Sequence, residues 1–170
     1  GQGLWEMPYR PTPLTFEVDG KKYFNERPTS TQQTGFSYVS QLRSWLPREI
    51  GGITWWGNDD GNMIAYVPIY CGNTVQPECF NTPGADAVTF SDKNAFWVCN
   101  MVYPRYSQMF PSLKQVRDSL ENSYFAQQES VEKKALSLYS SDKAGALKYL
   151  NDYSNEKAQQ MLERWKKLAI

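Results

Sequence analysis

Amide and guanidinium side chains gather between Thr29 and Pro47, and they are the first candidates for a binding site. Gln32, Gln33 and Thr34 come before an amphipathic stretch that contains Arg43. An amide offers both an acceptor and donors to a peptide bond, and a guanidinium can hold a carboxylate through two parallel hydrogen bonds. The same pattern is typical of a capped helix start with Arg43 on the solvent face. The local sequence leaves both interpretations open.

The chain contains no histidine, so any nucleophilic catalysis by its own residues would have to work without an imidazole base. This excludes Ser-His-Asp and Cys-His catalysis and His-ligated zinc from the chain itself. The three cysteines lack the CxxC spacing of a zinc site, and their odd number argues against a disulfide framework. Cys71 and Cys99 lie in apolar sequence and are expected to be buried and structural. Cys79 lies in a proline-containing loop and is expected at the surface.

A metal site is not expected either. The segment 58–62, NDDGN, resembles part of a calcium loop, but it lacks the later bidentate Glu at the required spacing. It is more typical of a hairpin turn. We therefore expect no metal and no cofactor.

The bulk composition limits the possible partners. The 170 residues carry 18 basic and 18 acidic side chains, so a nucleic-acid partner is not expected. No run of 18 apolar residues is present, so a membrane span is not expected. Aromatic residues make up 15% of the chain, which fits a core of large side chains or an aromatic-lined groove.

Glycine and proline divide the chain into two regions. Ten of the eleven glycines and nine of the ten prolines come before residue 111. We therefore expect a region of strands and turns with embedded helices over 1–110 and a helical region over 111–170.

Strands and one helix are expected in the first region. The segment 14–24 predicts a hairpin around Asp19-Gly20. The spacing of apolar residues over 36–46 predicts a helix that Pro47 ends. A second hairpin is expected over 51–74, with a strand over 63–71 that is apolar on both faces and in which Pro68 indicates an edge or a bulge.

Helices are expected to dominate the remainder. The segment 92–110 predicts a helix that Pro104 either kinks or breaks. The apolar spacing from Leu113 to Tyr124 continues the helical pattern. Asp142 and Ser154 are predicted N-caps of two further helices, the last of which ends near Leu168.

The segments STQQTGFSYVSQLRSWLP and YCGNT, within a longer similarity from Arg10 to Phe125, resemble the C-terminal half of the cysteine-type dipeptidases related to the secernins. These enzymes belong to the N-terminal-nucleophile hydrolases. The resemblance implies an α+β fold: part of a four-layer αββα sandwich with mostly antiparallel sheet, followed by a helical C-terminal region. It also implies hydrolysis of dipeptides by an N-terminal Cys whose own amino group serves as the base, so that no imidazole is required.

None of the cysteines in this chain matches that nucleophile by position. The chain is therefore expected to be a fragment that is inactive alone, that pairs with a missing N-terminal half, and that otherwise associates with itself. Gln33 and Arg43 are the positions nearest to the pocket arginine of related acylases, and we expect them to bind the dipeptide substrate. The alternative is a non-catalytic module that binds peptide or carbohydrate in an aromatic groove.

Overall fold

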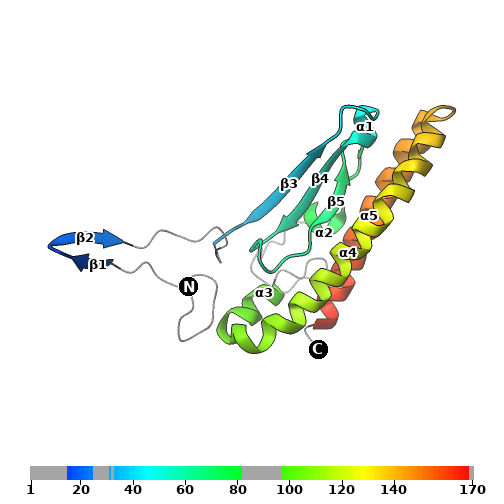
Figure 1. The fold of residues 1–170 in the computed structure, drawn as a ribbon. Coiled ribbons are helices and arrows are strands. Elements are labelled where there is room, and N and C mark those ends of the chain that lie inside the picture. The colour runs from blue at the N-terminus through cyan, green and yellow to red at the C-terminus, as the bar shows by residue number, and fades with distance from the viewer. Residues whose placement is uncertain (1–14, 25–30, 32, 82–96, 169–170) are drawn as a thin grey trace.

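A small antiparallel sheet with two long helices along one face forms the body of the molecule (Figure 1). The computed structural model describes residues 15–24, 31, 33–81 and 97–168. The strands are β1 (Thr15–Val18), β2 (Lys21–Phe24), β3 (Phe36–Leu42), β4 (Gly52–Asn58) and β5 (Val67–Tyr70). The helices are α1 (Arg48–Gly51), α2 (Glu78–Asn81), α3 (Trp97–Val102), α4 (Tyr106–Tyr139) and α5 (Lys143–Leu168), with a 3-10 turn over Tyr103–Arg105.

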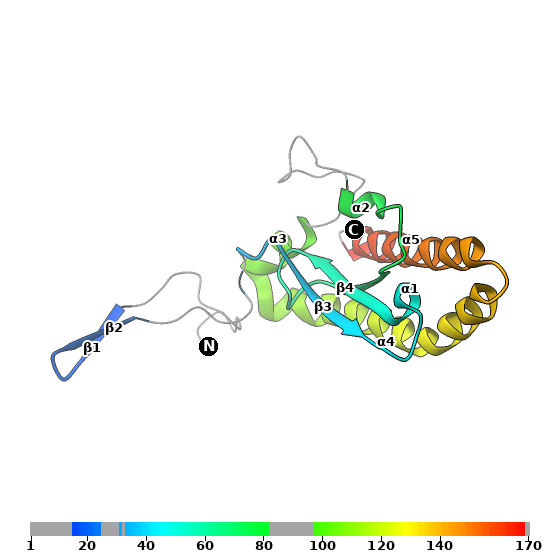
Figure 2. The same ribbon diagram turned by 90° about the horizontal axis from the view of Figure 1, so that it is seen from above.

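The hairpin predicted over 14–24 is present as β1 and β2. Asp19 and Gly20 both have positive φ, at 52° and 77°, which a tight two-residue hairpin turn requires. The turn pairs Phe16 opposite Tyr23, and their rings stack at 5.6 Å. This hairpin stands apart from the three-stranded sheet in both views (Figures 1 and 2).

The helix predicted over 36–46 is wrong, because Phe36–Leu42 is the strand β3. Phe36, Val39 and Leu42 fit a helical period, but the intervening aromatic and hydroxyl residues fit a strand equally well. Pairing with β4 over its whole length decides the outcome, with Val39 opposite Trp55. Pro47 then precedes the short helix α1 and does not end a longer one.

The second predicted hairpin is confirmed, since β4 pairs antiparallel with β5. The strand predicted over 63–71 is too long, because only Val67–Tyr70 pairs with β4. Met63, Ile64 and Ala65 are buried in the connecting turn. Pro68 lies on an edge strand, as expected, since the sheet order is β3-β4-β5.

Two of the features predicted for the helical region are confirmed and one is wrong. Pro104 lies in the 3-10 turn that separates α3 from α4. Asp142 caps α5, with its Oδ1 accepting a hydrogen bond from the Gly145 amide at 2.9 Å. Ser154 caps no helix, because α5 continues through it to Leu168. The buried residues Leu150, Ala158 and Leu162 keep one face of α5 on the core, so the helix has no reason to stop.

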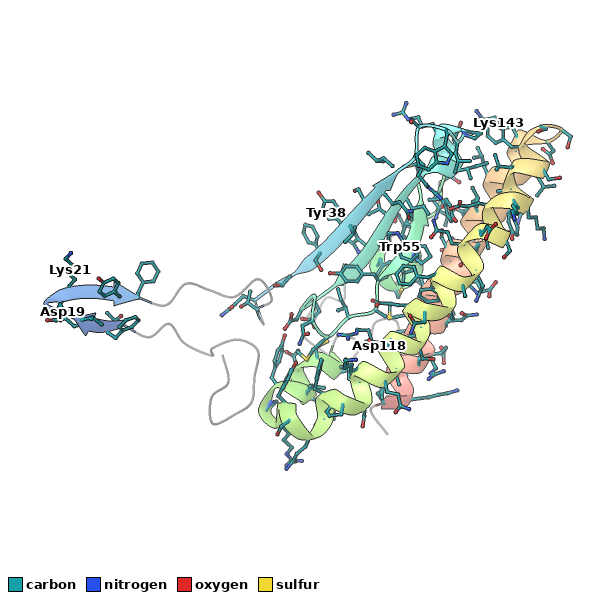
Figure 3. The ribbon with its side chains drawn as sticks, viewed as in Figure 1. Asp19, Lys21, Tyr38, Trp55, Asp118 and Lys143 are labelled. Atoms are coloured by element: carbon teal, nitrogen blue, oxygen red, sulfur yellow. The ribbon has the colours of Figure 1, made fainter. Side chains whose placement is uncertain are left out.

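The two faces of the three-stranded sheet have different surroundings. Helices α4 and α5 pack antiparallel and lie along one face in both views (Figure 2). Ile53 and Trp55 of β4 and Tyr70 of β5 point to this covered face and are buried. Phe36, Tyr38 and Leu42 of β3 point to the opposite face and are exposed. Figure 3 shows Tyr38 on the side away from the helices and Trp55 between the sheet and α4.

The architecture is α+β, as expected, with antiparallel sheets and then a long helical region. The helix α4 begins at Tyr106, and the division into 1–110 and 111–170 stays a prediction. Over the described ranges, no helix combines the length and the apolar character that crossing a bilayer demands.

Candidate functional site

Arg43 lies just after β3 and is held by three groups. Its Nη1 donates to Glu132 Oε2 at 2.5 Å, and both side chains are about nine-tenths buried. Its Nε and Nη2 donate to the backbone carbonyls of Gly51 and Ile50 at 3.3 and 3.1 Å. One guanidinium therefore joins the end of β3, the helix α1 and the helix α4. This arrangement differs from the solvent-facing arginine of a surface helix.

Glu132 is the buried partner that local sequence reasoning could not identify, since it lies far along α4. Its Oε1 accepts hydrogen bonds from the Tyr70 hydroxyl at 3.3 Å and from Gln128 Nε2 at 3.0 Å. Burial raises the pKa of Tyr70, and the neighbouring Glu132 carboxylate raises it further. The tyrosine therefore stays protonated and donates to the carboxylate. We call Arg43, Glu132, Tyr70 and Gln128 the Arg43 network.

The network continues across the covered face of the sheet. Gln128 Nε2 also donates to Gln41 Oε1 at 3.2 Å, and the Trp55 indole N–H donates to the same oxygen at 3.2 Å. These bonds satisfy polar groups that would otherwise be buried at a cost of about 1–3 kcal/mol each. The hydrogen bonds among these polar groups on the covered face thus hold β3 and β4 against α4.

A hollow of about 550 Å³ opens beside Arg43. We call it the Arg43 hollow; it is lined by Leu42, Arg43, Ser44, Leu46, Arg48, Gly51, Gly52 and Cys71. Arg48 and Cys71 are exposed there. A Cβ at residue 52 would collide with the Cys71 sulfur, so glycine allows the thiol to lie against the strand. The hollow combines two cationic side chains with a thiol. This suits an anionic group such as a carboxylate.

Arg48 was missed by the sequence reasoning. The sequence feature that could have indicated Arg48 is its position directly after Pro47, because proline favours the start of a helix. In the structure, α1 places Arg48 in the lining of the hollow. The error followed from extending a helix through 36–46, which put residue 48 outside any expected site.

Gln33 lies at the other end of β3 from Arg43. It is exposed, and its Oε1 accepts a hydrogen bond from the Thr31 hydroxyl. The seven residues of β3 separate it from Arg43, a span of about 20 Å. The expectation that Gln33 and Arg43 bind the substrate stays a prediction, with the two residues at opposite ends of β3. Gln32 lies outside the described residues.

The cysteines follow the sequence prediction in one of three cases. Cys99 is fully buried, as expected, and burial raises the pKa of its thiol well above the ordinary value. Cys79 is buried and not at the surface, because α2 turns it toward α5, and burial raises its pKa to about 12. Cys71 is exposed and not buried, because the strand β5 ends one residue earlier.

The predicted turn at 58–62 is confirmed. Asp60 is fully buried; its Oδ1 accepts the Asn62 amide at 3.0 Å and its carbonyl accepts the Met63 amide at 2.8 Å. Burial raises the pKa of the neighbouring Asp59 to about 6, although its Oδ1 accepts a hydrogen bond from the Asp60 amide. No group of three or more metal-ligating side chains comes together in the parts of the chain that are described.

The open face of the sheet carries a row of aromatic rings. The Trp56 ring stacks on Phe36 with centroids 5.0 Å apart and on Tyr38 with centroids 6.1 Å apart, each at an interplanar angle of 12°. We call these three residues the aromatic row. Phe36 and Tyr38 remain more than half exposed. A face of this kind is typical of a surface that meets another element or a ligand.

Comparison with known proteins identifies the family. The family model of peptidase family C69 matches residues 7–122, which is more than half of the chain. This match spans β1 to the first half of α4, including the Arg43 hollow and the aromatic row. No curated protein matches the chain. The expected relationship to the secernin-related cysteine dipeptidases is confirmed: the chain belongs to peptidase family C69.

Proposed function

We propose that this chain is part of a cysteine dipeptidase whose nucleophile lies outside these residues, at the mature N-terminus of a preceding half. The observation that carries the proposal is the family match over residues 7–122, which supports peptidase activity in general. The composition is consistent with it, because a chain without histidine can contribute to peptide hydrolysis when the base comes from elsewhere.

The chemistry would proceed through a covalent intermediate. The N-terminal α-amino group, with an ordinary pKa near 7.7–8.0, would take the thiol proton, and the thiolate would attack the peptide carbonyl carbon. Protonation of the departing amine would complete cleavage and leave an acyl-enzyme, which water then hydrolyses. The described residues contribute binding and support to this sequence of steps.

The Arg43 hollow is the proposed place for the substrate carboxylate. A dipeptide carries a free carboxylate within one residue of the bond to be cut, so a cation close to the nucleophile can select substrates by length. Arg48 is the exposed cation in the hollow. Arg43 is largely occupied by Glu132 and two carbonyls, so it would help mainly through the charge and position of its guanidinium. Gln33 remains a predicted substrate contact at a separate point.

The open face of the sheet is the proposed junction with the preceding half. An αββα sandwich places one face of each sheet on helices and the other face on the second sheet. Here α4 and α5 cover one face. On the other face, Trp56 and Ile69 share a hollow with Phe80 of α2, while Phe36, Tyr38 and Leu42 of β3 are exposed. A second sheet packed on the aromatic row would complete the layers.

The test compares this chain with a longer protein that includes the coding region before it. The 170-residue chain should release no amino acids from a panel of dipeptides, and the longer protein should hydrolyse them. Arg48→Ala in the longer protein should raise KM for dipeptides at least tenfold, and Arg48→Lys should restore part of the loss, since a cation is kept. A matched control is Arg105→Ala, which removes an exposed arginine from the 3-10 turn that precedes α4, at the opposite end of that helix from Glu132.

The decisive contrary result concerns Cys71. If the 170-residue chain hydrolyses dipeptides alone, and Cys71→Ser abolishes the activity, the nucleophile is in this chain and the proposal is overturned. Cys71 is the right residue for this test because it is the only exposed cysteine among the three in the chain.

A second candidate is a non-catalytic module that binds peptide or carbohydrate. The aromatic row favours it, because parallel, half-exposed rings offer a flat platform for a sugar or a peptide side chain. Calorimetric titration of the 170-residue chain with oligosaccharides and peptides separates the candidates. Saturable binding that Trp56→Ala removes would support the module. A flat titration would exclude it for the ligands tried.

A further inference from the structure

The two edges of the three-stranded sheet are protected very differently. At one edge, β5 has four residues, includes Pro68 and packs against α5. At the other edge, β3 has seven residues, FSYVSQL, with no charge and no proline. Natural proteins normally shield such edges with short strands, charges, proline or a covering element. β3 has none of the first three, and Val39 at its centre is 58% exposed.

The backbone groups that face this edge can be assigned. The Asp59 amide donates to the Gly35 carbonyl at 2.9 Å, and the Arg43 amide donates to the Gly51 carbonyl at 3.0 Å. Hydrogen-bonded and non-hydrogen-bonded pairs alternate along antiparallel strands, so the odd-numbered residues of β3 bond to β4. The amides and carbonyls of Phe36, Tyr38, Ser40 and Leu42 therefore point outward. No backbone hydrogen bond within the described ranges uses them.

We propose that β3 pairs antiparallel with β3 of a second copy of this chain, about a two-fold axis at Val39, to make a continuous six-stranded sheet. This register is self-complementary over the whole strand. Phe36 meets Leu42 of the partner, both apolar; Ser37 meets Gln41, both polar; Tyr38 meets Ser40; and Val39 meets itself. A two-fold contact pairs β3 with its own sequence, so a charged residue near the axis would lie close to its own copy; β3 carries no charge and avoids that repulsion.

The outward groups fit this register. Tyr38 and Ser40 of the two copies form hydrogen-bonded pairs, as do Phe36 and Leu42. Val39 then forms a non-hydrogen-bonded pair at the axis, where Cα atoms approach to about 4.5 Å and branched side chains pack closely. The pairing therefore uses the free backbone groups and buries the exposed valine at once.

An apolar groove beside the axis adds to the contact. It has a volume of about 350 Å³ and lies between β3 and α4; its lining includes Val39, Trp55 and Phe125. Phe125 contacts Trp55 with ring centroids 4.8 Å apart but is itself 55% exposed. Near the axis, Val39 and Phe125 of both copies would shield each other from water. We therefore assign the same partner, a second copy of this chain, to both the β3 edge and this groove.

Sedimentation equilibrium of the 170-residue chain at micromolar concentration tests the proposal. We expect twice the 19.6 kDa mass of the chain. Val39→Lys places two ammonium groups opposite each other and should yield the monomer, while Val39→Thr, which is uncharged and also β-branched, should remain dimeric. Because residue 39 is exposed in a single copy, neither change should alter the helical circular dichroism. A wild-type monomer, or a dimer that survives Val39→Lys, overturns the proposal.

Cross-linking tests the register. In a Cys71→Ser background, Val39→Cys should form an interchain disulfide on mild oxidation, because the predicted separation suits the bond. Leu42→Cys is the matched control: it is exposed, but its copy would lie six residues away along the strand, about 20 Å, and should not cross-link. Equal cross-linking at both positions, or none at Val39, contradicts the two-fold axis.

Discussion

The covered and open faces of the β3-β4-β5 sheet carry similar aromatic residues in different environments. Trp55 and Trp56 are neighbours in β4 and point to opposite faces. Trp55 is buried and its indole N–H is bonded to Gln41, whereas Trp56 stacks between the half-exposed rings of Phe36 and Tyr38. We infer that the contacts between the sheet and the helices α4 and α5 stabilise the fold, and that the open face is available for contacts outside the chain.

The largest expected effect is on the covered face. Arg43→Ala leaves the buried Glu132 carboxylate without its cation, and we expect a loss of about 3–5 kcal/mol in the free energy of unfolding. Chemical denaturation with the linear extrapolation measures it. Arg43→Ala combined with Glu132→Gln should recover part of the loss, since the orphaned charge is removed. An Arg43→Ala variant as stable as the wild type would show that the network contributes nothing.

A matched pair of truncations compares the two faces directly. Ile53→Ala on the covered face should cost about 2–5 kcal/mol, because it creates a cavity under the sheet. Tyr38→Ala on the open face, where the side chain is 57% exposed, should cost less than about 1 kcal/mol in the isolated chain. Thermal unfolding followed by circular dichroism measures both. Equal losses would mean that the open face is already covered in solution.

A smaller effect is expected at the turn that leads out of β4. The pKa of Asp59 in the folded chain is raised to about 6 from an ordinary 3.8, so the folded state binds more protons than the unfolded state between these values. Stability should therefore fall by about 2 kcal/mol as pH rises from 4 to 6. Asp59→Asn should flatten this dependence and still tolerate the positive φ of 83°. An unchanged slope would assign the dependence to other groups.

Local chemistry made part of this structure predictable. Asp19-Gly20 specifies the first hairpin because the turn type depends on those two residues alone. Asp142 specifies the start of α5 for the same reason. The family relationship could also be predicted from the sequence, because it depends on contiguous motifs such as STQQTGFSYVSQLRSWLP and YCGNT.

Nonlocal pairing explains the errors. Phe36, Val39 and Leu42 satisfy two periodicities, and only hydrogen bonding to β4 selects the strand. Cys79 is buried because α2 packs on α5, and nothing in its neighbouring sequence indicates that contact. The role of Arg43 depends on Glu132, which is 89 residues away in the chain.

That separation has a consequence for folding kinetics. The contacts between α4 and α5 close through a short turn at 140–142, whereas the Arg43–Glu132 pair closes a loop of 89 residues. Loop closure delays nonlocal contacts, so we expect the helical hairpin to form early and the sheet to dock on it later. If the ion pair forms after the rate-limiting step, Arg43→Ala will speed unfolding and leave the folding rate nearly unchanged. Arg43 would then slow the separation of the docked sheet from the helices without directing the docking itself.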